Sequence, residues 1–142
     1  MIIMQVHVNL LGVIVAAISS MLIGTIYYSD SVVGKQWRAL SKIDQKEFNK
    51  KMPKVMPYIF IAALLTAYIV GYFTYLFHNY FLGSWVGAGI QTSLILWLGV
   101  SATSIFIHSS LDQKPSKLIV IATGNRLLSI LAMGLILGLI HP

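Results

Sequence analysis

The sequence predicts an all-α integral membrane protein, a four-helix bundle of transmembrane helices in a single domain. Hydrophobic residues make up 57% of the 142 residues and charged residues only 10%, whereas soluble domains average about 45–50% and about 25%. The charged residues also cluster, and long uncharged stretches separate the clusters. So little charge cannot cover a water-soluble globule, which excludes a soluble enzyme, a disordered regulator and a nucleic-acid binder.

Four apolar stretches are long enough to cross a bilayer. The first lies within residues 1–29, and the last follows the basic residues at 114–117. Residues 55–111 would form a helix of about 85 Å, but the hydrocarbon core is only about 30 Å thick. This stretch must therefore turn back, and the polar residues and glycine within 78–84 mark the turn. The predicted spans are residues 6–28, 56–77, 85–107 and 118–140.

The basic residues predict how the chain is oriented. Seven of the ten Lys and Arg residues lie in the connection 29–55 and two lie in 108–117, whereas the other connection and both termini carry none. Because basic loops stay in the cytoplasm, we expect a multi-pass protein of the plasma membrane with both termini outside. A capping box at Ser41 and Asp44 predicts a short interfacial helix that runs to Lys51 and ends before Pro53. Its lysines are candidates for contact with anionic membrane lipid, although a solvated loop explains the same pattern.

Small residues recur at helical spacing and predict where helices touch. In lipid, small residues mark contact faces because they let two backbones approach closely. These faces could meet within one chain or between chains. The glycines of the last span favour a homo-oligomer, with the first or fourth span at the interface, or a subunit of a larger membrane complex. The candidate packing residues are Gly12, Ala16, Ser20, Gly24, Gly134 and Gly138.

Two segments carry a family resemblance. Residues 24–37 read GTIYYSDSVVGKQW, and residues 133–138 of the last span read MGLILG, after a Lys114-Pro115 pair. With Asn9 near the N-terminus, this pattern resembles the small membrane family catalogued as domain of unknown function 1761. Asp30 and residues 122–126 depart from the usual family pattern. The resemblance implies four spans over nearly the whole chain, and it implies no activity.

The same family motif supplies a candidate site at the basic side of the membrane. Aromatic residues are enriched at membrane interfaces, and a Gly-Lys pair between them could form a turn that binds an anion. The lone pair is far short of a phosphate-binding loop, so interface anchoring is the simpler interpretation. The residues concerned are Tyr28, Ser29, Gly34, Lys35 and Trp37.

Polar residues inside the spans are a second candidate site. Arg126 is the only ionisable Asp, Glu, Lys or Arg residue within a predicted span, and such a residue is a functional candidate by default. It could extend to the headgroups, pair with Asp30 or Asp112, or bind an anion or a lipid phosphate. The uncharged residues Asn9, Gln91 and Asn125 could form hydrogen bonds between helices or line a solute path.

Three histidines lie at the outer ends of different predicted spans, namely His7, His78 and His141. They could converge on Zn or Cu, although histidines that face headgroups explain the same pattern, and we expect no cofactor. With no Cys and no recognisable catalytic motif, enzyme chemistry is disfavoured. The sequence favours a non-catalytic oligomeric membrane subunit or scaffold. The alternatives are a dimeric transporter of a small solute or ion and, less favoured, a metal-handling or lipid-modifying protein.

Overall fold

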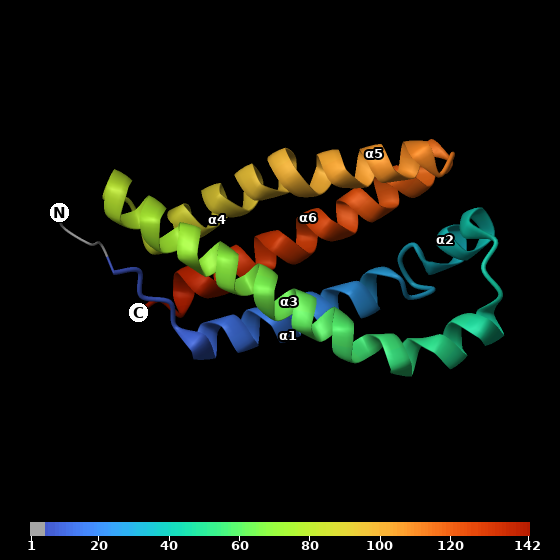
Figure 1. The fold of residues 1–142 in the computed structure, drawn as a ribbon, viewed down its shortest axis with the longest axis horizontal. Coiled ribbons are helices and arrows are strands. Elements are labelled where there is room, and N and C mark those ends of the chain that lie inside the picture. Colours follow the sequence, from blue (N-terminus) through green and yellow to red (C-terminus); the bar gives the residue numbers. More distant parts are fainter. Residues whose placement is uncertain (1–4) are drawn as a thin grey trace.

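The structure is a computed structural model that describes residues 5–142, and it is a bundle of long helices (Figure 1). Its α-helices are α1 (Leu10–Tyr27), α2 (Gly34–Ser41), α3 (Gln45–Phe81), α4 (Trp85–Leu96), α5 (Thr103–Leu111) and α6 (Ser116–Leu139). A π-helical segment, η1 (Trp97–Ala102), joins α4 and α5 into one rod. Within the described residues, α1, α3, this rod and α6 are long and apolar enough to cross a membrane. The predicted all-α membrane bundle is confirmed.

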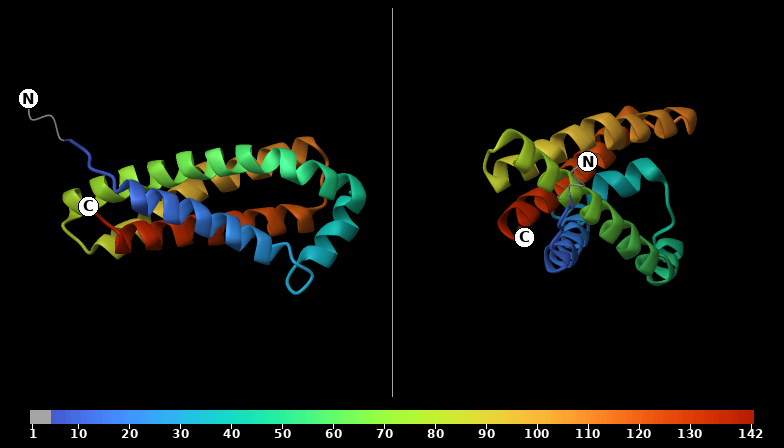
Figure 2. Two further views of the ribbon diagram at one scale, coloured as in Figure 1. Left: turned by 90° about the horizontal axis from the view of Figure 1, so that it is seen from below. Right: turned by 60° about the vertical axis from the view of Figure 1, so that its left-hand side comes forward.

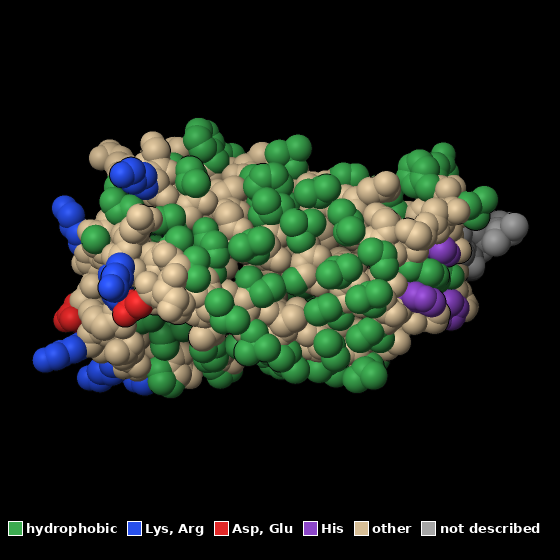
Figure 3. Space-filling view, turned by 180° about the vertical axis from the view of Figure 1, so that it is seen from behind, with side chains coloured by type: hydrophobic (Ala, Val, Ile, Leu, Met, Phe, Trp, Pro, Cys, Tyr) green, Lys and Arg blue, Asp and Glu red, His purple; other side chains and the backbone are tan. Residues whose placement is uncertain are grey.

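The bundle is built around α6, which packs against α1, α3 and α4 (Figure 2). Figure 3 shows an apolar belt between two polar ends, with Lys and Arg side chains at one end and histidines at the other. We call these the basic end and the histidine end. The helices pack closely toward the histidine end, whereas α3 and α5 diverge toward the basic end (Figure 1). There α5 packs on η1 and α6.

The core lies between α1, α3 and α6 and consists of small and medium apolar side chains. Ala16, Ala17, Ala67 and Val70 are completely buried, and Met133 of α6 fills the space between them. Alanines at these positions allow close helix packing, which supplies the van der Waals contact that stabilises helix pairs in lipid. Part of the small-residue stripe of the first span is therefore used within the chain.

The closest approach between helices is the crossing of α4 and α6. A Cβ atom on Gly134 would collide with the carbonyl oxygen of Gly89 and with Ser93 Oγ, and one on Gly138 would meet the backbone of Val86. Ser93 Oγ also donates a hydrogen bond of 2.8 Å to the carbonyl oxygen of Ile130. The glycines of the last span favoured a contact with a partner chain. In the structure, α4 of the same chain fills the groove at these glycines.

The stripe on α1 divides between two environments. Gly12 packs against the end of α6 near Ile140, while the space around Gly24 is open. Ser20 lies between them and donates its hydroxyl hydrogen to the carbonyl oxygen of Ala17 within its own helix.

Three boundary predictions are wrong. The span expected from residue 6 begins at Leu10, because Asn9 caps the helix by accepting hydrogen bonds from the backbone N–H groups of Leu11 and Gly12. The connection 29–55 contains α2, which was not predicted, and α3 begins after Asp44 rather than Ser41. Asp44 accepts a hydrogen bond of 3.1 Å from the N–H group of Lys46, so it is the N-cap residue.

The predicted break before Pro53 is also absent, because α3 continues through both Pro53 and Pro57. Each proline removes one backbone donor, and the four-residue spacing places both on one side of the helix. Carbonyl groups freed near a polar interface can bind water, so the helix can continue.

Candidate functional site

Arg126 is the charged residue that the fold places inside the bundle. It lies four, seven and eleven residues before Ile130, Met133 and Leu137, so it occupies the same face of α6. Those three residues belong to the core. Arg126 therefore lies directly next to the core, on its basic side, and its Nη2 donates a hydrogen bond of 3.3 Å to Thr66 Oγ1 of α3.

The hydrogen bond between Arg126 and Thr66 lies on the basic side of the core. Gly71 of α3 would contact Leu137 of α6 through an added Cβ atom. Thr66 and Arg126 precede these two residues in their helices, by five and eleven residues, so both lie nearer the basic end. The hydrogen bond therefore joins α6 to α3 between the core and that end.

The two acids considered as partners of Arg126 both have other partners in the structure. Asp30 pairs with Arg38, and Asp112 lies 3.5 Å from Lys114. Asp44 caps α3, and the remaining acid lies in the first turn of that helix. Within residues 5–142 Arg126 therefore forms no ion pair, and it has one hydrogen bond.

The π-helical segment lies at the level of Arg126. The hydrogen bond between Ser93 and Ile130 puts these two residues at one level. The two helices are antiparallel, so Trp97, the first residue of η1 and four residues after Ser93, is level with Arg126, four residues before Ile130. The Nε1–H group of Trp97 donates a hydrogen bond of 3.1 Å to the carbonyl oxygen of Thr123. Thr66, Trp97 and η1 do not stand out in the sequence, because hydroxyl groups, aromatic residues and π-turns are ordinary in apolar spans.

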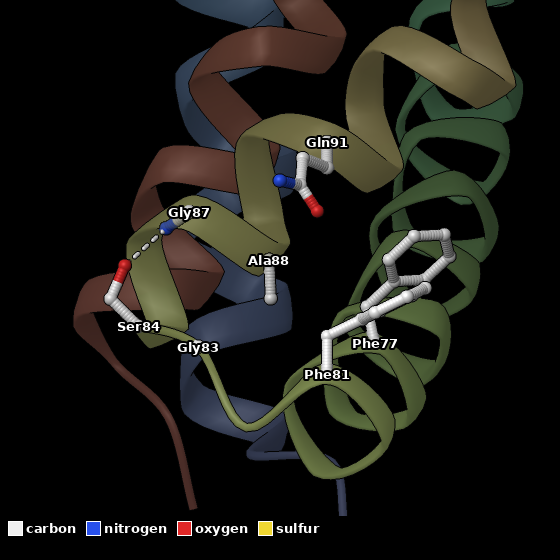
Figure 4. A pocket seen from close by; sticks show the side chains of 7 residues that line it. All are labelled: Phe77, Phe81, Gly83, Ser84, Gly87, Ala88 and Gln91. Atoms are coloured by element: carbon white, nitrogen blue, oxygen red, sulfur yellow. Dashed lines mark hydrogen bonds between the residues drawn. The ribbon is translucent and has the colours of Figure 1, made fainter.

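The other three polar candidates do not join Arg126. Asn9 is used as the cap of α1. The Oδ1 atom of Asn125 is buried and has no hydrogen-bond partner among the described residues. Gln91 lines a pocket of about 400 Å³ between α3 and α4, where its side chain faces Phe77 and Phe81 (Figure 4). Asn9 and Gln91 thus lie apart from Arg126, whereas Asn125 is its neighbour in α6 and forms no hydrogen bond with it.

Three of the four histidines gather at one end around Trp85. The rings of His78 and His141 stack on its indole ring, with centroids 3.7 Å and 4.7 Å away and nearly parallel planes. Two imidazoles on one face would overlap at these distances, so they occupy opposite faces. Tyr75 links this stack to His7 through edge contacts of 6.1 Å. Residues from the ends of all four spans thus form one aromatic cluster, which we call the histidine clasp.

The clasp does not have the geometry of the metal site considered above. The indole ring of Trp85 lies between the imidazoles of His78 and His141, so the two cannot bind one ion. No group of three or more His, Cys, Asp or Glu side chains within residues 5–142 is arranged to hold a metal. Stacked aromatic rings each stabilise a fold by about 0.5–1.5 kcal/mol beyond their buried area, so the clasp joins the helix ends.

The family-motif segment forms the connection between α1 and α2. The N–H group of Gly34 donates a hydrogen bond of 2.9 Å to the carbonyl oxygen of Ser29, and a Cβ atom here would collide with the backbone of Tyr28. Trp37 packs against Tyr28 and, on its other side, against Phe48 of α3. Glycine is needed for this close approach, and the tryptophan holds α2 against both neighbouring helices.

The remaining polar groups of this turn do not converge. Ser29 Oγ donates to the carbonyl oxygen of Ile26 at 2.6 Å, and Lys35 is exposed. The turn therefore positions α2, and its side chains do not surround an anion.

Comparison with known proteins agrees with the resemblance noted in the sequence. A family profile described as "Protein of unknown function (DUF1761)" matches residues 11–138. No curated protein and no solved structure matches the chain. Because the matched region covers all four spans and nearly the whole sequence, the chain belongs to this DUF1761 family.

Proposed function

We propose that this protein is a non-catalytic subunit or scaffold of a larger membrane assembly, held there by its intramembrane arginine. The observation that carries the proposal is that, among residues 5–142, Arg126 faces the bundle interior with a single hydrogen bond, to Thr66, and with no carboxylate partner. A cation within a span is costly unless it is paired or hydrated. A partner that supplies an acceptor at this depth would remove that cost.

The partner that meets this need is a different polypeptide. Three acids of this chain lie outside the spanning helices, and the fourth, Glu47, lies in the first turn of α3 at the basic end, so a second copy in the same orientation brings no carboxylate to the depth of Arg126. A helix that carries Asp or Glu within its own span would bring one.

The proposal includes an orientation. The basic end would face the cytoplasm and the histidine clasp would face outward, with the protein in the plasma membrane. The support is the partition of nine basic residues to one side and none to the other. Anionic lipid at the basic end and self-association of the subunit belong to the same proposal.

The mass of the purified assembly tests the proposal. The full chain is tagged and purified in mild detergent from its native membrane. The mass of the purified assembly should exceed an integer multiple of the mass of the chain, because the assembly contains a second component. Arg126→Gln should release the additional component. Lys54→Gln, which removes the same charge near the basic end of α3, should retain it. A wild-type mass that is always an integer multiple of the chain would contradict the proposal.

A synthetic helix tests the chemistry directly. A labelled polyleucine transmembrane peptide with one central Glu should bind the protein in vesicles more tightly than the same peptide with Gln. The preference should disappear in Arg126→Gln. Equal binding of both peptides to the wild-type protein would show that Arg126 does not select a carboxylate.

A second candidate function is a dimeric transporter of a small anion. The observation that favours it is the shared level of η1 and Arg126, because irregular helix segments at mid-membrane depth often form solute sites. Flux measurements in liposomes distinguish the two functions. Anion flux that Arg126→Gln abolishes would favour the transporter, whereas an impermeable wild-type vesicle favours the subunit.

A further inference from the structure

The short helix α2 is held in a defined position at the basic end of the bundle. Trp37 lies between Tyr28 and Phe48, with ring centroids 5.3 Å and 5.4 Å away. The close approach at Gly34 places the first turn of α2 directly against the end of α1. The hydroxyl group of Tyr27 donates a hydrogen bond of 2.8 Å to the carbonyl oxygen of Ile121, which ties α1 to α6. These contacts also fix α2 relative to the first turns of α6.

A pocket of about 310 Å³ lies between α2 and the beginning of α6. Ala39 and Leu40 provide its apolar surface, Gln36 provides an amide, and Lys117 provides a cation. Val120 lies one turn further into the bundle from Lys117 and is 70% exposed. The pocket therefore combines a charged and polar lining with an apolar surface that continues toward the membrane interior.

The charge of this pocket is not neutralised by the protein. Lys117 forms no ion pair in the described part of the chain, and the first turn of α6 contains no acidic residue. The acid nearest in sequence, Asp112, pairs with Lys114. An anion is thus the complementary ligand for Lys117, and a charge-assisted hydrogen bond is stronger than a neutral one.

We propose that this pocket binds an anionic phospholipid from the leaflet at the basic end. The phosphate group contacts Lys117, the amide of Gln36 contacts the headgroup, and an acyl chain runs along Val120. A lipid fits better than a soluble anion because it matches both surfaces. Its headgroup matches the polar pocket, and its acyl chain matches the exposed apolar helix face beside the pocket. The family motif then has a role, since it holds α2 where Gln36, Ala39 and Leu40 complete the pocket.

Lipid titration with native mass spectrometry tests this site. The full chain in mild detergent is titrated with phosphatidylglycerol and, for comparison, phosphatidylcholine. Diffuse attraction accounts for about 1 kcal/mol per basic residue, or about a fivefold change in the dissociation constant. Lys54→Gln should weaken phosphatidylglycerol binding by no more than that. Lys117→Gln should weaken it by more than about tenfold, because it also removes a direct contact.

A second variant tests the shape of the site without changing its charge. Ala39→Leu fills the pocket from the exposed side of α2 and should weaken phosphatidylglycerol binding at least about fivefold. Thermal unfolding of each variant checks that the fold is retained. Equal losses in the two lysine variants, or unchanged binding in Ala39→Leu, would overturn the proposal. So would displacement of the lipid by millimolar inorganic phosphate, which would indicate a site for a soluble anion.

Discussion

Replacement of Gly134 by Ala should destabilise the bundle, whereas the same replacement at Gly24 should stabilise it. At Gly134 the new methyl group would lie within collision distance of Gly89 and Ser93, so α4 and α6 must separate. At Gly24 no atom lies within 4 Å of the added carbon. The two variants make the same chemical change in two transmembrane helices, and only their packing differs.

The contacts of Gly134 give the magnitude. An overpacked interface costs about 1–3 kcal/mol, and weakening of the hydrogen bond from Ser93 to Ile130 adds about 0.6 kcal/mol. Alanine is a better helix former than glycine by about 1 kcal/mol in an aqueous helix, which benefits both variants. We therefore expect the free energy of unfolding to fall by about 0.6–2.6 kcal/mol for Gly134→Ala and to rise by up to about 1 kcal/mol for Gly24→Ala.

Reversible unfolding in mixed detergent and SDS micelles, followed by circular dichroism, measures both free energies. Gly89→Ala should resemble Gly134→Ala, because it enlarges the same contact from the opposite helix. The double variant should then be less destabilised than the sum of the single effects, since one separation relieves both collisions. Equal stabilities for Gly134→Ala and Gly24→Ala would refute the α4–α6 crossing. A change of oligomer mass with unchanged stability would place Gly134 between chains.

Three further predictions address the two ends of the molecule. Trp85→Leu keeps apolar bulk but removes both imidazole stacks, so the free energy of unfolding should fall by about 1–3 kcal/mol; an unchanged value would leave the histidine clasp without a role in stability. Gly34→Ala should displace α2 and expose the connection 29–55 to proteolysis, and a rate of cleavage equal to that of wild type would contradict the packing at Tyr28. Single cysteines at Gln45 and Ser84 should react with an impermeant reagent from opposite sides of the membrane, and reaction from the same side would contradict the four-span topology.

The number of spans could be read directly from the chain, because it depends on a property of consecutive residues. Four apolar stretches separated by polar turns determine four helices in any membrane of ordinary thickness. Helix ends were less predictable where local rules compete. Asn9 is a strong N-cap and makes the first helix begin later than predicted, whereas Pro53 and Pro57 look like breaks but lie within α3.

The candidate site required the tertiary structure, because a sequence does not state how a helix is rotated or what faces it. The spacing from Arg126 to Met133 shows that both share a face of α6, but the contact with Thr66 depends on where α3 crosses. The motif at Gly34 likewise looked like a possible anion turn, and the structure uses it to position α2.

By itself, the sequence determined the all-α class, the four spans and the concentration of basic residues at one end, since hydropathy and charge are properties of each segment. The tertiary structure alone decided which surfaces meet. It used Gly134 for α4 rather than for a second chain, placed His78 and His141 on opposite faces of Trp85, and left Arg126 without a carboxylate within the described residues. These outcomes depend on helix order, rotation and crossing, which arise from packing among residues far apart in the chain.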